Sequence, residues 1–357
     1  MGILIFILIL GFLVLIHEAG HFFMARFFKV RVEEFGIGFP PRLWAKKRGD
    51  ITYSINALPL GGFVKIYGEN GEDKGNADSF GAKPIWQRAL ILSAGVFNNF
   101  IFCFLILVLL FSLGMPSLIT PANQKYVVQK EVRVIDVSKN SPASLIQLST
   151  GDKIVAIKYQ GEIFENMSIS QFQEKIKSFA GNEILLVVEK QGKILDLAVT
   201  PRVTYPAEEG SLGISLMEAG IVAFPVYQSF WEAGSTMFTG AYQIVKAIGQ
   251  NVKALFVKTE APDLSGPVGI AMISSKTYHL GWRYIGSFLA VLSLNLAVLN
   301  FLPFPALDGG RLFFLLIEKI RRKPVSQKIE AMANTVGFAF LMFLVLLITI
   351  KDIRNLI

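Results

Sequence analysis

Two of the three histidines in this chain lie in one short motif, HEAGH at residues 17–21. Because residues four apart share one face of a helix, both imidazoles can bind one metal ion, with Glu18 beside it. Zinc is commonly bound in this way, and a neighbouring glutamate can then take a proton from water. The motif therefore predicts a hydrolytic zinc (Zn2+) site in which His17 and His21 are ligands and Glu18 is the general base.

The motif lies in a chain with the composition of a membrane protein. Hydrophobic residues make up 52% of its 357 residues, and the mean hydropathy is +0.50. Four segments reach the roughly 20 apolar residues that cross a hydrocarbon core, at residues 1–25, 89–113, 284–307 and 331–350. The last three contain no charged residue, whereas the first contains the motif. We therefore expect an α-helical integral membrane protein with about four transmembrane helices.

Two other interpretations of the N-terminal segment fit its residues less well. Unrelated core histidines with a glutamate would be costly in lipid, since one charged side chain at the bilayer centre costs about 2.5–3.5 kcal/mol on insertion scales. A cleaved signal peptide requires a basic start and a small-residue cleavage site, and residues 1–16 offer neither. We therefore expect this segment to be a membrane helix that carries the metal site.

A catalytic zinc ion usually has three protein ligands and an open position, so a third ligand must come from another segment. Asp308 is the isolated acidic residue near another span, within NFLPFPALDGG at residues 300–310. The two prolines should break the third span, and the two glycines should allow a tight turn. Taken alone, Asp308 could equally be an ordinary turn residue at the membrane interface.

Depth in the membrane favours Asp308 as the third ligand. If the first helix enters from outside near Ile3, a rise of 1.5 Å per residue places His17 about 21 Å and His21 about 27 Å along it. The third span also enters from outside, and its break lies toward the cytoplasmic side. Asp308 can therefore reach the level of both histidines, which predicts one site formed by the three residues.

Lys and Arg residues give the chain a net charge of +8, and they gather beside the spans. Membrane topology explains this distribution better than nucleic-acid binding, because short cytoplasmic loops carry the Lys and Arg excess. The loops between the first and second spans and between the third and fourth should be cytoplasmic. We therefore expect both termini and the region 114–283 to be extracytoplasmic, and no nucleic-acid partner.

The chain divides into four expected parts. Residues 1–114 hold two spans, the motif and a loop near the membrane, and residues 115–216 hold an extracytoplasmic α+β domain. Residues 217–283 hold amphipathic helices at the membrane surface, and residues 284–357 hold the last two spans with Asp308. Each boundary follows a change in hydrophobic pattern.

Local patterns predict elements within these parts. Alternating residues broken by Gly and Pro predict β-hairpins in the first loop, and the polar, Gly-rich stretch 70–81 predicts a mobile loop. Apolar residues at helical spacing over 229–257 predict a helix along the membrane surface. The α+β domain has strand-like runs at 132–137, 153–159, 184–190 and 194–199 and a helical run at 170–179.

Four asparagines lie inside the apolar spans. Asn98 and Asn99 are in the second span, and Asn295 and Asn300 are in the third. Such amides can join helices by hydrogen bonds, or they can contribute to the site. The sequence leaves both possibilities open.

Several motifs together resemble the site-2 protease family, most closely its bacterial regulator-of-sigma-E protease type. They occur in the order of that family across nearly the whole chain. The matching segments are HEAGH at 17–21, LPLGGFVK at 58–65, QRA at 87–89 with AGVFNNF at 94–100, LSGPVGI at 264–270, and residues 295–310.

The resemblance implies an intramembrane zinc metalloendopeptidase of the bacterial inner (cytoplasmic) membrane. Its substrates would be single-span membrane proteins already shortened outside the membrane, such as anti-sigma factors or signal-peptide remnants. A PDZ-like domain at 115–216 would screen them by size, and a β-hairpin layer at 35–69 would extend toward the active site. The implied substrate-binding residues are Gly61, Gly62, Asn295, Asn300, Pro303 and Pro305.

Two residues depart from the pattern of the family. Val96 stands where Pro is usual, and Gln147 stands where the PDZ core commonly has Gly. The region 114–216 has room for about one domain of ordinary size, whereas some relatives carry two PDZ domains in tandem.

Two other function classes remain open from the residues alone. One is a membrane scaffold whose metal site is structural or lost. The other is a metal-dependent transporter, because buried His, Glu and Asp can line an ion path. The residues predict neither the substrate nor the oligomeric state.

Overall fold

The computed structural model describes residues 2–69, 75–120, 123–190, 192–206, 209–257, 266–279 and 281–354. The chain forms two compact units. One comprises Met1–Leu107, Trp231–Ser275 and Gly286–Ile357, and the other comprises Val108–Phe230 and Lys276–Ile285. Of the loop predicted at 70–81, residues 70–74 lie outside the described residues, and Phe80–Ala82 forms a short 3-10 helix.

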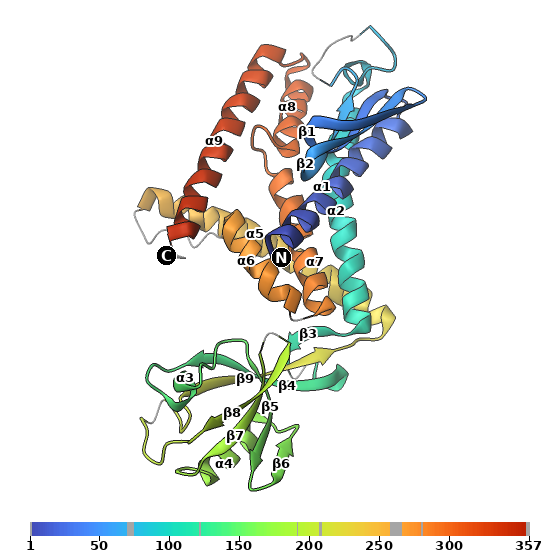
Figure 1. The fold of residues 1–357 in the computed structure, drawn as a ribbon. Coiled ribbons are helices and arrows are strands. Elements are labelled where there is room, and N and C mark those ends of the chain that lie inside the picture. The colour runs from blue at the N-terminus through green and yellow to red at the C-terminus, as the bar shows by residue number, and fades with distance from the viewer. Residues whose placement is uncertain are drawn as a thin grey trace. The chain divides into compact units, whose positions relative to one another are not determined.

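Four helices of the described chain are long and apolar enough to cross a membrane (Figure 1). Each coincides with one predicted segment, so the multi-pass membrane architecture is confirmed. They are α1 (Gly2–Phe27), α2 (Ile85–Leu113), α7 (Trp282–Phe301) and α9 (Gln327–Arg354). Helix α5 (Val226–Val257) confirms the helical spacing over 229–257, and α6 (Pro267–His279) also lies within the region 217–283, where helices were expected.

The third span ends earlier than the sequence predicted. Helix α7 stops at Phe301, residues 302–307 are neither helix nor strand, and α8 (Asp308–Arg321) then begins. The break is explained by the two prolines, which have no N–H to donate within a helix. The predicted tight turn at the two glycines is wrong, because both lie in the first turn of α8. A Cβ on Gly309 would lie 2.2 Å from Leu302 O, so glycine lets this turn pack on the preceding loop.

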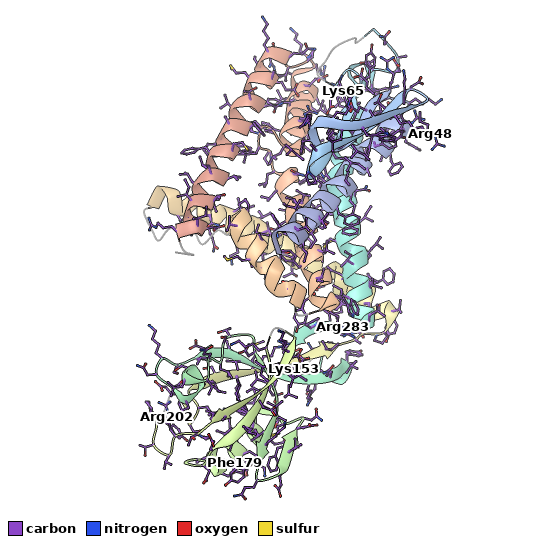
Figure 2. All side chains as sticks on the ribbon, in the orientation of Figure 1. Arg48, Lys65, Lys153, Phe179, Arg202 and Arg283 are labelled. Carbon is purple, nitrogen blue, oxygen red and sulfur yellow. The ribbon has the colours of Figure 1, made fainter. Side chains whose placement is uncertain are left out.

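Strands β1 (Val32–Arg48) and β2 (Ile51–Ile66) confirm the predicted hairpin after α1. Phe35 pairs with both Tyr53 and Val64, so the first half of β1 lies between the two halves of β2. The hairpin therefore folds back on itself into a narrow sheet, and the second half of β2 forms one edge of that sheet. Figure 2 marks Arg48 at the end of β1 and Lys65 near the end of β2.

Glycines bring β2 close to α1. Gly61 has φ +135°, a conformation that side chains rarely adopt, and a Cβ there would lie 2.9 Å from Val14 Cγ1. A Cβ on Gly62 would lie 2.7 Å from Leu15 Cδ2. The hairpin is thereby packed on the turn of α1 that precedes the HEAGH motif.

The second unit contains a seven-stranded antiparallel sheet. Its strands are β3 (Met115–Leu118), β4 (Val127–Val137), β5 (Lys153–Tyr159), β6 (Glu162–Glu165), β7 (Ile184–Lys190), β8 (Lys193–Val199) and β9 (Ile214–Val222). Their order in the sheet is β3-β9-β4-β5-β7-β8, and β6 pairs with β5. Two helices accompany the sheet, α3 (Pro142–Leu145) and α4 (Ile169–Ser178).

The predicted α+β content of this unit is confirmed. The four strand-like runs correspond to β4, β5, β7 and β8, and the helical run corresponds to α4. Strand β9 is distant from β4 in the sequence but pairs with it, and β9 continues past the expected domain end at residue 216.

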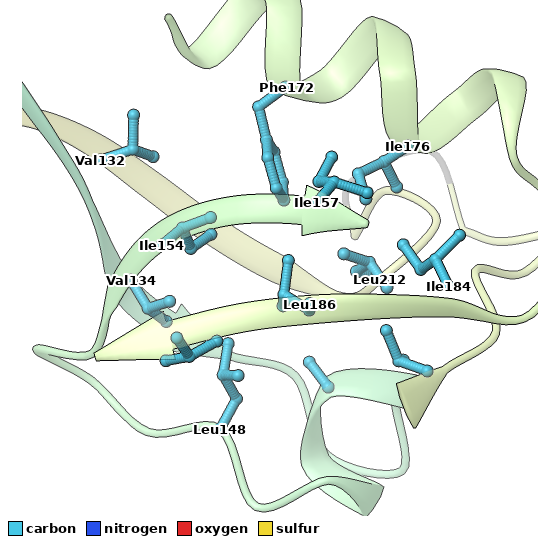
Figure 3. Close-up of a cluster of buried hydrophobic side chains, with 13 residues drawn as sticks. Val132, Val134, Leu148, Ile154, Ile157, Phe172, Ile176, Ile184, Leu186 and Leu212 are labelled. Atoms are coloured by element: carbon cyan, nitrogen blue, oxygen red, sulfur yellow. The ribbon is translucent and has the colours of Figure 1, made fainter. Parts of the chain in front are cut away.

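Helix α4 closes the core of this unit over the sheet (Figure 3). Phe172 and Ile176 of α4 are buried together with Ile157 of β5 and Leu186 of β7. Full burial of each such side chain stabilises the fold by about 1.5–3 kcal/mol. The α4 N-terminus is fixed by a capping box between Ser168 and the Gln171 side chain.

Candidate active site

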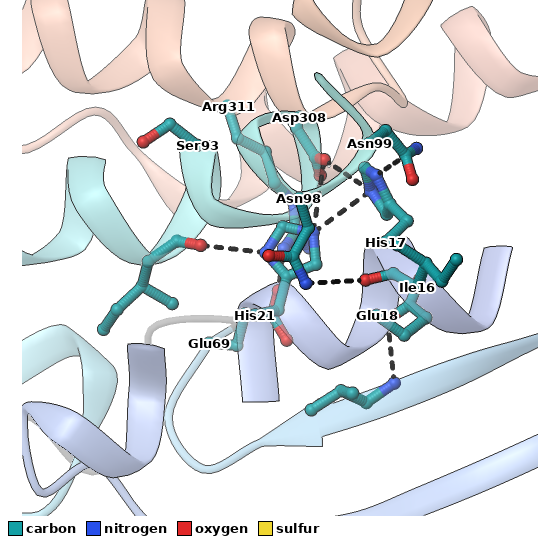
Figure 4. Close-up of polar contacts among 12 residues, drawn as sticks. Ile16, His17, Glu18, His21, Glu69, Ser93, Asn98, Asn99, Asp308 and Arg311 are labelled. Carbon is teal, nitrogen blue, oxygen red and sulfur yellow. Dashed lines mark hydrogen bonds and ion pairs between the residues drawn. The ribbon is translucent and has the colours of Figure 1, made fainter. Parts of the chain in front are cut away.

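Helix α1 places both histidines of the HEAGH motif on one buried face. Their side chains point toward one another (Figure 4), with 3.2 Å between His17 Nε2 and His21 Nε2. The residues are only 5% and 7% exposed, respectively. This contact follows directly from the i, i+4 spacing on a helix.

The first residue of α8 completes the cluster. Asp308 Oδ2 lies 2.9 Å from His17 Nε2 and 3.3 Å from His21 Nε2. This oxygen is buried, and none of the described residues donates a hydrogen bond to it in acceptable geometry. One ligand atom from each of the three residues therefore faces the same small region.

The position of the proton on the His21 ring indicates which kind of ligand can bind in that region. His21 Nδ1 lies 2.8 Å from the carbonyl oxygen of Ile91, so this nitrogen carries the proton of a neutral ring and donates it. Nε2 of His21 then presents a lone pair, next to a second imidazole nitrogen and a carboxylate oxygen. Such atoms repel one another unless a proton or a cation lies between them.

The observed separations fit zinc. With bonds of 2.0–2.2 Å, neighbouring ligand atoms of a tetrahedral zinc ion lie about 3.3 Å apart. The three separations here are 2.9, 3.2 and 3.3 Å. Two imidazoles and one carboxylate are also a ligand set found in catalytic zinc enzymes.

Gly95 of α2 leaves space at the same point. A Cβ there would lie 2.4 Å from His21 Nε2 and 2.8 Å from His17 Nε2. Any side chain at position 95 would therefore enter the region on which the ligand atoms converge. The residues present fit a bound zinc ion both in donor chemistry and in space.

Glu18 lies between the motif and the hairpin. Its Oε2 accepts a hydrogen bond of 3.1 Å from the backbone N–H of Val64 in β2 (Figure 4). Glu18 also lines a cavity of about 550 Å³ with His21, Asp308 and residues of β2 and α9. An ion pair between Arg311 of α8 and Glu69 lies at the wall of this cavity. The carboxylate is thus beside the cluster and open to a hollow that can hold substrate or water.

The residues expected to bind substrate lie in different surroundings. Asn300 lines a hollow of about 200 Å³ with His17, Glu18 and Asp308. The Asn295 amide instead donates to Val291 O of its own helix at 2.9 Å.

The remaining expected substrate residues differ in how far they are buried. Pro303 is exposed, whereas Pro305 packs against α9, where a Cβ on Gly337 would lie 2.6 Å from Pro305 O. Gly61 and Gly62 face α1, as described above. A role for these residues in substrate binding stays a prediction.

The two asparagines of α2 differ in what they contact. Asn98 Nδ2 donates to Ile16 O at 2.9 Å, which joins α2 to α1. Asn99 instead lies at the cluster, with its Nδ2 3.3 Å from His17 Nδ1. The sequence did not distinguish these roles. Gly95 and Asn99 are four residues apart and so share one face of α2, and this spacing is the signal that could have found them.

Comparison with known proteins identifies relatives along the whole chain. Residues 5–344 match the family model of peptidase family M50. A predicted zinc metalloprotease of Clostridium perfringens is 36% identical over 357 residues, which cover 99% of this chain and 98% of the relative. The regulator of sigma-W protease RasP of Bacillus subtilis is 29% identical over 440 residues, which cover 99% of this chain and 98% of RasP. The zinc metalloprotease RasP of Geobacillus kaustophilus is 28% identical over 434 residues, with the same coverage.

Proposed function

Because this chain belongs to peptidase family M50 and is a zinc metalloprotease of the site-2 type, we propose that it hydrolyses peptide bonds within transmembrane segments of single-span membrane proteins. One observation carries this proposal. Three ligand atoms, from His17, His21 and Asp308, converge at 2.9–3.3 Å in a chain with four candidate membrane spans.

We assign His17, His21 and Asp308 as the three protein ligands of zinc. When bound, the zinc ion supplies a Lewis acid that polarises the scissile carbonyl and makes water easier to deprotonate. The tautomer of His21 is held by Ile91 O, which keeps Nε2 directed at the site. Two helices thus position all three ligands, because His17 and His21 lie on α1 and Asp308 is the first residue of α8.

Glu18 is the proposed general base. Its Oε2 is held by the Val64 N–H, and its second carboxylate oxygen can take a proton from the attacking water. The same carboxyl group then delivers the proton to the leaving amine. Because Glu18 lies beside the ligands and lines the large cavity, proton transfer and substrate entry involve the same space.

The edge formed by the second half of β2 is the proposed site for an opened substrate. A transmembrane helix hides its carbonyl groups in internal hydrogen bonds, so it must unwind before water can attack one of them. The N–H of Val64 points toward Glu18, so this edge of the sheet faces the proposed general base. A substrate strand that adds to the edge would lie alongside the general base.

Further substrate contacts are proposed around this edge. Asn300 is the best placed of the predicted residues, because it lines a hollow with His17 and Glu18. Gly61 and Gly62 keep β2 packed on α1 and so hold the edge near the site. Asn295, Pro303 and Pro305 remain candidates.

The second unit is proposed to be a PDZ-like domain that screens substrates by size before cleavage. Strand β3 pairs with β9 over Ala219–Val222, and Ile119 N–H donates to Glu218 O, so among the described residues the stretch Ile214–Met217 is open on that side. Helix α4 lies beside this stretch, where its Ile169 N–H donates to Glu218 Oε1 at 3.2 Å. An open strand next to a helix can accept an extended peptide.

The proposed location is the bacterial inner membrane, with both termini and the second unit extracytoplasmic. The Lys and Arg clusters in the loops after α1 and before α9 support this orientation. The relative named as a regulator of sigma-W protease supports an anti-sigma-factor-like substrate for this chain. Signal-peptide remnants are alternative substrates that the same reaction could cleave. Besides its substrates, the lipid bilayer is the other proposed partner of the chain.

Cleavage of a model substrate tests the proposal. The purified chain in lipid nanodiscs should cut a single-span peptide within its apolar segment, at a position that mass spectrometry identifies. Addition of a zinc chelator should stop cleavage, and restored zinc should return it. Cleavage restricted to the segments outside the bilayer would contradict an intramembrane activity.

A further inference from the structure

The second ring nitrogen of each histidine faces a different group on α2. His21 Nδ1 donates to the backbone carbonyl of Ile91, whereas His17 Nδ1 faces the side-chain amide of Asn99. A histidine that binds metal through Nε2 keeps its proton on Nδ1 and needs an acceptor for it. His21 has such an acceptor from the backbone. For His17, the described group that faces Nδ1 is the Asn99 amide, whose oxygen can be that acceptor.

Asn99 is held firmly where this contact occurs. The residue is 0% exposed. Ser293 of α7 donates a hydrogen bond of 2.8 Å to the Asn99 backbone carbonyl. One residue earlier, Asn98 joins α2 to α1 through Ile16 O. Burial and the Ser293 contact therefore hold this turn of α2 beside His17, and the side-chain amide of Asn99 lies next to the ring.

The amide of Asn99 has two possible orientations, which differ in hydrogen bonding. With Nδ2 toward His17 Nδ1, two nitrogens meet at 3.3 Å, and Asn99 Oδ1 is buried with no partner among the described residues. Rotation of the amide by half a turn exchanges the two atoms without any other movement. Oδ1 then accepts the Nδ1 proton of His17, and Nδ2 takes the buried position that Oδ1 held.

We propose that Asn99 is a positioning residue for the metal site, which holds His17 in the Nδ1–H tautomer by accepting its proton on Oδ1. This inference rests on the proposed zinc ligands. The chain then has two matched supports on α2, the Ile91 carbonyl for His21 and the Asn99 amide for His17. Each support keeps a ring nitrogen directed at zinc, as carboxylates or carbonyls do behind other zinc-bound histidines.

Zinc affinity measured by competition with a chelator tests this role directly. Asn99→Leu keeps a similar volume and removes the acceptor, so it should weaken zinc binding about 10–100-fold. Asn99→Asp offers only acceptor oxygens and should bind zinc at least as tightly as the wild type. Asn98→Leu is the matched control, because it removes a neighbouring amide that contacts no histidine, and its zinc affinity should not change.

Cobalt substitution gives a second readout that does not depend on hydrolysis. Cobalt-loaded Asn99→Leu should show altered visible absorption bands, because His17 is no longer held in one orientation, whereas Asn98→Leu should match the wild type. This comparison tests the role of Asn99 even if the buried carboxylate of Asn99→Asp prevents folding.

The outcomes distinguish this inference from the metal site on which it rests. Zinc binding by Asn99→Leu as tight as in the wild type, while His17→Ala loses zinc, would overturn the role of Asn99 and leave the ligands intact. Equal weakening in folded Asn99→Leu and Asn99→Asp would overturn the acceptor role. Wild-type zinc affinity in His17→Ala would overturn the metal site itself.

Discussion

Val64 of β2 and Glu18 of α1 are joined by a hydrogen bond of 3.1 Å from the backbone N–H to Oε2. This bond connects the proposed substrate edge with the proposed general base. It uses a backbone donor, so most side-chain substitutions leave it in place. Proline removes the donor, and edge strands tolerate proline where the N–H points away from the sheet.

Val64→Pro should therefore lower catalysis without loss of zinc. A hydrogen bond to a charged group contributes about 1.5–3 kcal/mol, so we expect kcat/KM to fall about tenfold or more. Val64→Ala keeps the N–H and should retain nearly full activity, with the same zinc content. Equal activity in the proline and alanine variants would mean that this bond does not orient Glu18 for reaction.

Gly95→Ala should exclude zinc from the site by volume alone. The added methyl group would lie 2.4 Å from His21 Nε2, in the region where the ligand atoms meet. We expect zinc affinity to fall by at least about tenfold, as for loss of a ligand support, and hydrolysis to be lost. Gly249→Ala in α5 is the control, because a Cβ there meets nothing within 4 Å. Full zinc occupancy in Gly95→Ala would place the metal elsewhere.

Topology reporters test the proposed orientation. A reporter fused after Gly75 should read cytoplasmic, and one fused after Gly192 should read extracytoplasmic, as the distribution of Lys and Arg requires. Alkaline phosphatase and a fluorescent protein give opposite signals at the two positions. The reverse pattern would put the second unit in the cytoplasm and remove its proposed screening role.

The sheet of the second unit contains a charge cluster that predicts a pH dependence. Burial alone would raise the pKa of Glu131, but hydrogen bonds and charges from Lys153 and Arg133 outweigh burial and lower this pKa below its ordinary value. A lowered pKa means that the carboxylate stabilises the folded state at neutral pH. That contribution is lost as the pH falls through the folded-state pKa.

Glu131→Gln should therefore destabilise this sheet at neutral pH, by about 1–2 kcal/mol. The difference from the wild type should shrink below about pH 4, where the carboxyl group of the unfolded chain is already protonated. Hydrogen exchange of the β4 and β5 amides, at pH 7 and at lower pH, measures both quantities. A difference that stays constant with pH would show that packing, not charge, is responsible.

The parts of the site that the sequence predicted are those that depend on local geometry. The grouping of His17, Glu18 and His21 follows from the periodicity of one helix, and the length of the apolar segments predicted the four spans. Asp308 required one further argument, about depth in the membrane. The exact end of the third span was missed, because the start of α8 depends on how its first turn packs against the preceding loop.

The residues that the sequence did not predict depend on how separate elements meet. Gly95 and Asn99 lie beside the histidines only because α2 packs against α1 in one register. Val64 reaches Glu18 only because the hairpin folds back on itself. The pairing of β9 with β4 likewise joins strands far apart in the chain. Hydrophobic periodicity describes each element alone and carries no information on these contacts.

The central claim is that Glu18 acts on water whereas His17, His21 and Asp308 hold the metal. The most direct test measures zinc content and hydrolysis together in Glu18→Gln and Asp308→Asn. Glu18→Gln should keep near-stoichiometric zinc and lose hydrolysis, since an amide cannot accept the proton. Asp308→Asn should lose zinc affinity and activity together, because it neutralises a ligand. Full zinc and full cleavage in Asp308→Asn, with zinc lost in Glu18→Gln, would contradict these assignments.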